Sequence, residues 1–188
     1  TGPAAQSCST YTPSSDDSLY AIQAGDTLGT VSVEGVVVTA VRDLGVWVME
    51  PGGGTCSGIW LYTGAEHGLT RGDLVDASGI VDEYYDLTEL NAVKGAFADV
   101  GSAAVPAAEW LALAALQAPG AEEWEGVLVE IRDVEVTVVP SSATEDEWVV
   151  TDGPDSLVID DQMYDISDDE TLTVGQDFAS ITGILNYT

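Results

Sequence analysis

Hydrophobic and polar positions along the chain follow a pattern that is typical of β-strands rather than of helices. Residues 31–41 read VSVEGVVVTAV, a run rich in β-branched side chains that alternates in part between apolar and polar positions. Further runs of this kind follow, and a Pro-Gly-Gly-Gly turn signal at residues 51–54 separates two of them. These runs are residues 45–50, 57–62, 73–81 and 84–100. The pattern therefore predicts a five-stranded region over residues 25–104.

The segments on either side of this region have a different character. Residues 1–24 begin rich in Ser, Thr and Pro and predict an extended N-terminal segment, in which residues 19–24 form a short strand. Residues 105–120 contain an Ala- and Leu-rich run that starts at Pro106 and stops before Pro119, as helices do. We predict that this run is a short helix that links two β regions.

The β pattern recurs after the predicted linker helix, over residues 121–188. Four short matches follow one another in the same order in both halves, and the spacing between matched residues grows slowly, as loop insertions produce. The matches are 34–38 with 125–129, 46–48 with 147–149, 69–72 with 172–175, and 79–81 with 183–185. We interpret the chain as all-β and internally duplicated, with two tandem five-stranded Greek-key barrels. Trp47 and Trp148 are then expected to hold the same position in the two cores.

The second copy of the pattern is shorter than the first. It reaches Thr188 at the position that corresponds to Tyr84, so the second barrel is expected to be incomplete within the chain. Unpaired strand edges recruit other strands. Three donors stay open: sequence beyond Thr188, residues 1–24 of the same chain, or the same segment of a neighbouring molecule. The third donor predicts self-assembly into a filament by strand complementation.

The charge of the chain limits its partners. Four basic residues stand against 33 acidic ones, which gives a net charge of −29. Binding to phosphate backbones draws on Lys and Arg, so charge-driven binding of nucleic acid is excluded, and an anionic membrane repels the chain. No apolar run is long enough to span a bilayer, and the start at Thr1 without a basic leader favours a mature secreted form. Cations such as Ca²⁺, neutral glycans and other proteins fit this charge.

The two cysteines, Cys8 and Cys56, lie far apart in the sequence. An even number of cysteines in a chain with extracellular character predicts one disulfide, with two buried free thiols as the alternative. The bridge is expected to pin the N-terminal segment to the first barrel and to stabilise the fold by about 3–4 kcal/mol on the chain-entropy model. A zinc site is not expected, because His67 is the only histidine.

Two groups of side chains are candidates for ligand binding. Six acids crowd residues 160–170 and predict a Ca²⁺ site, with a solvated acidic face as the alternative. The candidate metal ligands are Asp160, Asp161, Asp165, Asp168 and Asp169. The aromatic residues Trp60, Tyr84 and Tyr85 are candidates for stacking on sugars or bases. His67 lies in a loop without the features of a catalytic triad, so no catalytic residue and no enzymatic activity are expected.

Three segments of the first region carry a resemblance to a known family. Residues 36–41, 45–51 and 84–90 resemble the OB-fold domains of bacterial extracellular proteins, among them surface proteins and accessory domains of secreted nucleases. The resemblance is clearest over residues 31–100 and weaker over residues 125–188. It implies two OB-like barrels and a location outside the cell or at the cell surface.

Two functions follow as expectations. The first is a non-catalytic extracellular structural or adhesive module that acts through its surfaces and has itself or other surface proteins as partners. The alternative is an accessory module that binds carbohydrate or nucleic acid for a secreted hydrolase, because one face of an OB barrel binds such ligands. One fold hosts many functions, so the choice between them depends on the site.

Overall fold

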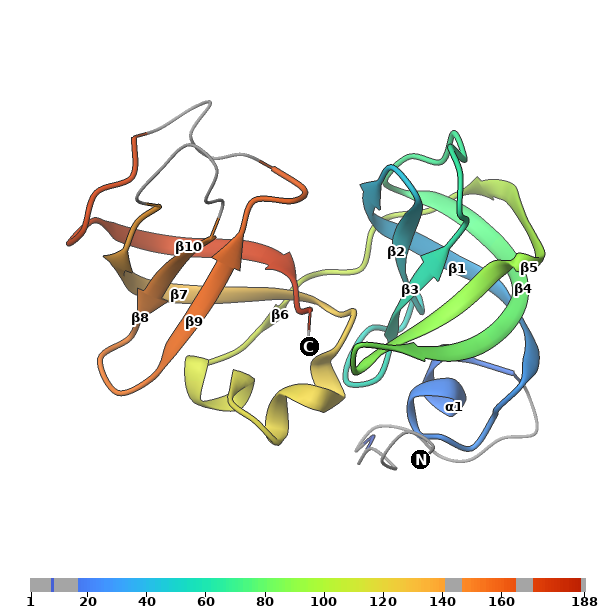
Figure 1. The fold of residues 1–188 in the computed structure, drawn as a ribbon, viewed down its shortest axis with the longest axis horizontal. Coiled ribbons are helices and arrows are strands. Elements are labelled where there is room, and N and C mark those ends of the chain that lie inside the picture. Colours follow the sequence, from blue (N-terminus) through green and yellow to red (C-terminus); the bar gives the residue numbers. More distant parts are fainter. Residues whose placement is uncertain (1–7, 9–16, 141–146, 165–170, 187–188) are drawn as a thin grey trace.

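The computed structural model describes residues 8, 17–140, 147–164 and 171–186. It contains two β units that lie side by side and are joined by a segment with short helical turns (Figure 1). The strands of the first unit are β1 (Thr30–Arg42), β2 (Gly45–Met49), β3 (Gly58–Tyr62), β4 (Asp73–Tyr84) and β5 (Leu87–Ser102). Strands dominate the described residues, so the predicted all-β class is confirmed.

The first unit is a closed five-stranded barrel with the strand order β1-β2-β3-β5-β4. Strand β5 pairs in parallel with β3 and antiparallel with β4, and β4 closes the barrel on β1. The long strand β1 bends at Gly35, whose φ of 65° favours glycine, beside a register shift between Val33 and Val36. The barrel is filled by buried aliphatic side chains: Val33, Val36, Val38, Val46, Val48, Ile59, Leu61, Val75 and Leu90.

Residues 19–24, expected as a short strand, form the helix α1 (Leu19–Gln23) instead. Ser18 caps this helix, because its Oγ accepts a backbone hydrogen bond from the first turn. Leu19 and Ile22 lie three positions apart, so a helix places both on one side, where they enter the barrel core. A strand would have pointed them to opposite faces. The helix is therefore the conformation that buries both side chains.

The second unit is an open sheet in the described part of the chain. Its strands are β6 (Glu109–Trp110), β7 (Leu128–Val138), β8 (Glu147–Thr151), β9 (Ser156–Asp160) and β10 (Asp177–Ile184). The order is β10-β7-β8-β9, and β6 runs parallel to β7. β6 lies outside residues 121–188 and joins this sheet, but it pairs with β7 and does not take the place of the missing last strand, so the three donors expected from the sequence stay predictions. One closed barrel and one open sheet replace the two barrels that were predicted.

The prediction that residues 105–120 form a linker helix is wrong. The segment contains β6 and the 3₁₀ helix η1 (Leu113–Leu116), and a second 3₁₀ helix, η2 (Gly120–Trp124), follows. Leu113 and Leu116 are buried in the core of the second unit. Pairing with β7 and burial of these leucines outweigh the helical propensity of the Ala- and Leu-rich run, because propensity is a weak local preference.

The same turn occurs at one predicted match in both units. Gly72 N donates a hydrogen bond to Val38 O at 2.9 Å, and Gly175 N donates one to Val136 O at 2.8 Å. The strands that contain these valines, β1 and β7, both shift register immediately after them. The second unit therefore repeats the strand plan of the first from β1 to β4, with β7, β8, β9 and β10 as the counterparts.

This alignment corrects the first of the four predicted matches. Gly35 corresponds to Asp133, and the two residues share a positive φ, of 65° and 53°. Gly126, matched with Gly35 from the sequence, lies instead against Gly58 at the contact between the units. A Cβ atom on Gly58 would overlap the Gly126 carbonyl group, so glycine there lets the two backbones touch.

Further contacts join the two units around this glycine pair. The backbone N–H of Leu128 lies 3.1 Å from the Met49 sulfur, and Met49 packs into the core of the second unit although it belongs to β2. Cys56 N donates a hydrogen bond to Glu123 O at 2.7 Å. The first unit therefore contributes a side chain to the second core, which couples the stability of the two.

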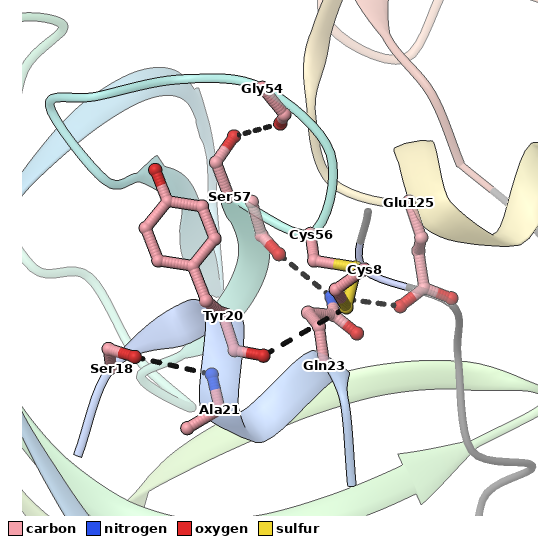
Figure 2. The surroundings of a disulfide bond; sticks show 10 residues. Cys8, Ser18, Tyr20, Ala21, Gln23, Gly54, Cys56, Ser57 and Glu125 are labelled. Carbon is pink, nitrogen blue, oxygen red and sulfur yellow. Dashed lines mark hydrogen bonds between the residues drawn. A yellow bond between two sulfur atoms is a disulfide. The ribbon is translucent and has the colours of Figure 1, made fainter. Parts of the chain in front are cut away.

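The predicted disulfide between Cys8 and Cys56 is confirmed (Figure 2). The two Cα atoms lie 5.6 Å apart, and the bridge ties the N-terminal segment to the loop after β2. No helix among the described residues has the length and apolar character needed to cross a membrane.

Candidate functional site

An aromatic cleft of about 1250 Å³ lies on the outer face of the first barrel. It is built by β2, β3, the β1–β2 turn and the β4–β5 hairpin, with two side chains from the second unit at its edge. The sequence-predicted stacking residues Trp60, Tyr84 and Tyr85 all line this cleft. The structure thus brings together three aromatic side chains that lie on two separate segments of the sequence.

The floor of the aromatic cleft is a tryptophan pair. Trp47 on β2 and Trp60 on β3 face each other in the strand register, with ring centroids 5.1 Å apart and planes inclined by 54°. Val46 and Val48 point into the barrel core, so Trp47 between them points outward. Trp47 is buried, as expected, at 3% exposure, but it lies on the outer face of β2 and not among the side chains that fill the barrel. The alternation of β2 carries the signal, because a residue between two core valines lies on the outer face.

The second unit has no such pair at the corresponding position. The register of β7 with β8 places Val149 where the first unit has Trp47, and the facing residue on β9 is Val158. Trp148 lies one position earlier and is buried in the second core, as predicted for it. Its expected equivalence with Trp47 is wrong, because a shift of one residue along a strand moves the side chain to the opposite face.

The rim of the cleft carries two exposed tyrosines on the β4–β5 hairpin. Tyr84 is 62% exposed and Tyr85 is 78% exposed, and their rings pack edge to face with centroids 4.7 Å apart. Tyr84 pairs with Leu87, which leaves Tyr85 and Asp86 as a two-residue turn, with φ of 51° and 65°. Such turns favour Asn and Gly, and a non-glycine residue held at positive φ costs on the order of 1 kcal/mol. The turn therefore presents a tyrosine at the cost of some backbone strain.

Hydrogen-bond acceptors line the cleft beside the rings. Burial raises the pKa of the Glu89 carboxyl group, and the negative charge of Asp82 raises it further. Asn91 Nδ2 donates to Glu89 Oε1 at 3.4 Å, while Asn91 Oδ1 is buried and has no hydrogen-bond partner among the described residues. Arg42 is the one basic side chain in the described lining, and its guanidinium carbon lies 5.9 Å from the centre of the Trp60 ring.

The predicted metal ligands fall in two parts. Asp160 accepts hydrogen bonds from the backbone and side chain of Gln162, at 2.9 and 2.6 Å, and Asp161 follows it in the same turn. The other three candidates, Asp165, Asp168 and Asp169, lie outside the described residues. Within the described residues no cluster of three or more His, Cys, Asp or Glu side chains is arranged to hold a metal ion. Ca²⁺ binding by this tract stays a prediction.

Both ring nitrogens of His67 form hydrogen bonds to the backbone. Its Nδ1 accepts a hydrogen bond from Leu69 N at 3.1 Å, which leaves Nε2 to carry the proton and to donate to Arg42 O at 2.9 Å. Both ring nitrogens thus hold the loop before β4 against the end of β1. This arrangement occupies the two groups that a general base or a metal ligand needs free.

A buried carboxyl group, that of Glu125, lies where the two units meet, beside Gln23 of α1 (Figure 2). Glu125, which is 1% exposed, accepts hydrogen bonds from Thr88 N at 3.0 Å and Gln23 Nε2 at 3.4 Å. Burial raises its pKa to about 8, so the group is neutral at pH 7. The second oxygen, Oε2, has no partner among the described residues, and protonation turns this unsatisfied acceptor into a donor. The group fastens η2 to α1 and β5.

The aromatic cleft is the candidate site that gathers the stacking residues predicted from the sequence. The exposed rings of Tyr84 and Tyr85 offer flat apolar surfaces, whereas Trp47 and Trp60 beneath them are only 3% and 8% exposed. The carboxylate and amide oxygens of the cleft accept hydrogen bonds from hydroxyl groups. Lining of this kind fits a neutral polyhydroxylated ligand better than an anion. Comparison of the chain with protein-family models, with curated proteins and with solved structures finds no match.

Proposed function

We propose that the protein is a secreted, non-catalytic module that binds neutral oligosaccharides in the aromatic cleft of an OB-type barrel. One observation carries this proposal: the paired rings of Trp47 and Trp60 and the exposed rings of Tyr84 and Tyr85 line one cleft rich in acceptor oxygens. Sugar rings stack their C–H faces on aromatic side chains, and their hydroxyl groups donate to carboxylates and amides.

The OB assignment rests on connectivity and on the place of the cleft. The strand order β1-β2-β3-β5-β4 with a parallel β3–β5 pair is the order of an OB barrel. In OB barrels, ligands bind on the face of the second and third strands, between the β1–β2 and β4–β5 loops. The aromatic cleft is built from these same elements. This similarity to OB barrels supports a binding role, whereas the class of ligand depends on the residues that line the cleft.

The lining favours sugar over nucleic acid. Single-stranded nucleic acids need aromatic platforms and also a basic groove along the backbone. Here Arg42 is accompanied by Asp43, Asp82, Asp86 and Glu89 in the cleft, and the whole chain carries a net charge of −29. Phosphates at this site meet repulsion rather than counterion release. A neutral glycan keeps the stacking energy without that repulsion.

Location outside the cell is part of the same proposal. The Cys8–Cys56 disulfide is weakly consistent with an oxidising compartment, because structural disulfides are rare in reducing ones. Glycans of cell surfaces and extracellular matrices are abundant in such compartments. A non-catalytic module is expected to act there by attaching the cell or a partner enzyme to a polysaccharide.

The test is a screen of the purified protein against neutral oligosaccharides, followed by titration of the tryptophan fluorescence. We expect saturable quenching at micromolar to millimolar ligand, since Trp47 and Trp60 form the cleft floor. Tyr84→Ala removes one exposed ring and is expected to weaken binding by about tenfold. Single-stranded DNA is the competing ligand and is expected to give no response at physiological salt.

Trp110→Ala is the matched control. Trp110 is 59% exposed, close to the value for Tyr84, but it lies on β6 of the second unit. It is expected to leave the affinity unchanged. Equal losses in both variants, or no saturable response to any oligosaccharide, contradict the proposal, and tight binding of DNA favours the nucleic-acid alternative.

A further inference from the structure

The two units differ at the place that β5 holds in the first barrel. There, β5 lies between β3 and β4 and pairs with both, for example through Leu61 opposite Leu90. The counterparts in the second unit are β9 and β10. Among the described residues, β9 pairs with β8 alone and β10 pairs with β7 alone. The second sheet therefore presents two strand edges at the position that β5 fills in the first.

A groove of about 660 Å³ runs along the inner face of the sheet between these edges. The side chains that line it include Val129, Ile131, Trp148, Leu157, Ile159, Ile181 and Leu185. Leu157 and Ile159 correspond to Ile59 and Leu61, which are both 0% exposed in the closed barrel, whereas the second pair is half-buried. Apolar side chains and two edges that have no strand partner among the described residues thus face the same groove; at one end of β9, Gln117 Nε2 donates a hydrogen bond to Ser156 O at 3.0 Å.

We propose that this groove binds an extended, basic segment of another protein, which adds to the second sheet as a strand. By analogy with β5, the segment runs parallel to β9 and antiparallel to β10. Its alternate side chains are apolar and enter the groove, as Leu90 and Ala92 enter the barrel core. Main-chain hydrogen bonds to both edges supply affinity, and the apolar positions set the register.

Charge decides the class of the partner. Residues 121–188 contain one basic residue, Arg132, which pairs with Glu130 at 2.7 Å. Among the charged residues that line the groove, Glu147 and Asp160, which face each other on β8 and β9, outnumber Arg42 of the first unit. A second copy of this chain brings a net charge of −29 to an acidic surface, which opposes association. A segment with Lys or Arg at its outward positions is attracted to the same surface.

A synthetic peptide with the sequence of residues 87–97 is the first probe, since it contains the part of β5 that fills the barrel. A second peptide carries Glu89→Lys and Asn91→Lys, at the outward positions on either side of Leu90. We expect the basic peptide to bind the whole protein about tenfold more tightly than the parent at low salt, and the difference to shrink as salt is added. A third peptide with Leu90→Ser and Ala92→Ser is expected not to bind.

Two variants of the protein locate the binding. Ile159→Ser places a hydroxyl group in the groove. It is expected to lower the affinity for the basic peptide by about tenfold, because an apolar contact is lost and a polar group is buried. Val138→Ser on β7 is the matched control: the Val138 side chain is 52% exposed and does not line the groove, and its loss is expected to leave the affinity unchanged. Circular dichroism confirms that both variants keep the fold.

Amide hydrogen exchange gives the readout that a nonspecific contact does not. The backbone amides of β9 and β10 that point away from β8 and β7, toward the open edges, are expected to exchange quickly in the free protein and to slow at least tenfold when the basic peptide is bound. Three results overturn the proposal. They are strong protection of both edges in the free monomer, which places a segment of the same chain in the groove; self-association in sedimentation that protects them; and equal binding of the parent and basic peptides.

Discussion

The first and second units share one strand plan and use it differently. In both, the first strand bends and shifts register, and a glycine N–H closes the turn before the fourth strand onto that first strand, at Gly72 and at Gly175. The outer face of the second and third strands holds Trp47 and Trp60 in the first unit and valines in the second. The first is closed by β5, and the second is open among the described residues.

This difference shows which features the plan itself requires. The turn and the bulge recur because they shape the backbone, which every copy of the sheet needs. The outer face and the last strand are free to vary, because neither sets the path of the first four strands. We infer that the first unit keeps a ligand cleft, whereas the second keeps an edge for a partner.

The largest effect is expected from a substitution that breaks the contact between the units. Gly58→Ala forces a Cβ atom into the backbone of Gly126, where no side-chain movement can relieve the overlap. We expect a loss on the order of 5 kcal/mol in the free energy of unfolding, or separate unfolding of the second unit, measured by urea denaturation with hydrogen exchange read for each unit.

Gly183→Ala is the control for this substitution. Gly183 lies on β10, has no positive φ, and a Cβ atom there meets nothing within 4 Å. It is expected to change the free energy of unfolding by less than about 0.5 kcal/mol. Equal effects at the two glycines contradict the view that backbone contact holds the units together.

The next effect concerns the first unit alone. Replacing both Cys8 and Cys56 by Ser opens a link that spans 48 residues, and we expect a loss of about 3–4 kcal/mol in the free energy of unfolding of the first barrel. Urea denaturation measures the loss, and reduction of the parent protein is expected to reproduce it. The reductant is expected to leave the free energy of unfolding of the double variant unchanged. A change in that variant would show that the reductant acts on something other than the disulfide.

The third effect is a dependence on pH that comes from the contact between the units. The pKa of Glu125 is raised to about 8 in the folded protein, while in the unfolded chain it is near 4.5. Between these values the unfolded chain loses the proton that the folded chain keeps, so stability falls as pH rises from about 4.5 to 8 and then levels off. We expect this group to contribute a slope of at most about 1.4 kcal/mol per pH unit within that window.

Glu125→Gln tests the assignment, because the amide is neutral at every pH and also carries a donor. Urea denaturation at pH 5, 6.5 and 8 is expected to show a flatter slope than the parent and a more stable protein at pH 8. Burial also raises the pKa of Glu50 and of Glu83, so part of the slope persists in the variant. An unchanged slope shows that Glu125 is ionised in the folded state.

The strands of the first barrel can be predicted from the sequence, because β-branched runs and glycine turns are local signals. The helix α1 cannot, because its reason is the burial of Leu19 and Ile22 in a core formed by distant strands. The linker fails for the same reason: its leucines favour a helix locally, but β7 offers them a sheet and a core. Tertiary contacts decide where local preferences are weak.

The candidate site follows the same division. Trp60, Tyr84 and Tyr85 can be proposed from the sequence because aromatic residues on strands are conspicuous. The position of Trp47 can be found only from the strand register. Matching the repeats with an error of one residue assigned its side chain to the core instead of the outer face. The groove between β9 and β10 requires the pairing of the whole sheet.

The smallest effect separates the stability of the first unit from its proposed function. Tyr85 holds a φ of 51° in the β4–β5 turn, a conformation that glycine adopts without strain. Tyr85→Gly is therefore expected to leave the free energy of unfolding unchanged or to raise it by up to about 1 kcal/mol, while oligosaccharide affinity falls by about tenfold with the lost ring. Thermal unfolding and fluorescence titration on the same sample measure both. Tyr85→Asn is the companion variant, because Asn also tolerates positive φ, and it is expected to behave like Tyr85→Gly in both measurements. If both variants destabilise the barrel and bind as well as the parent, the hairpin is a structural element and the aromatic cleft does not extend to its tip.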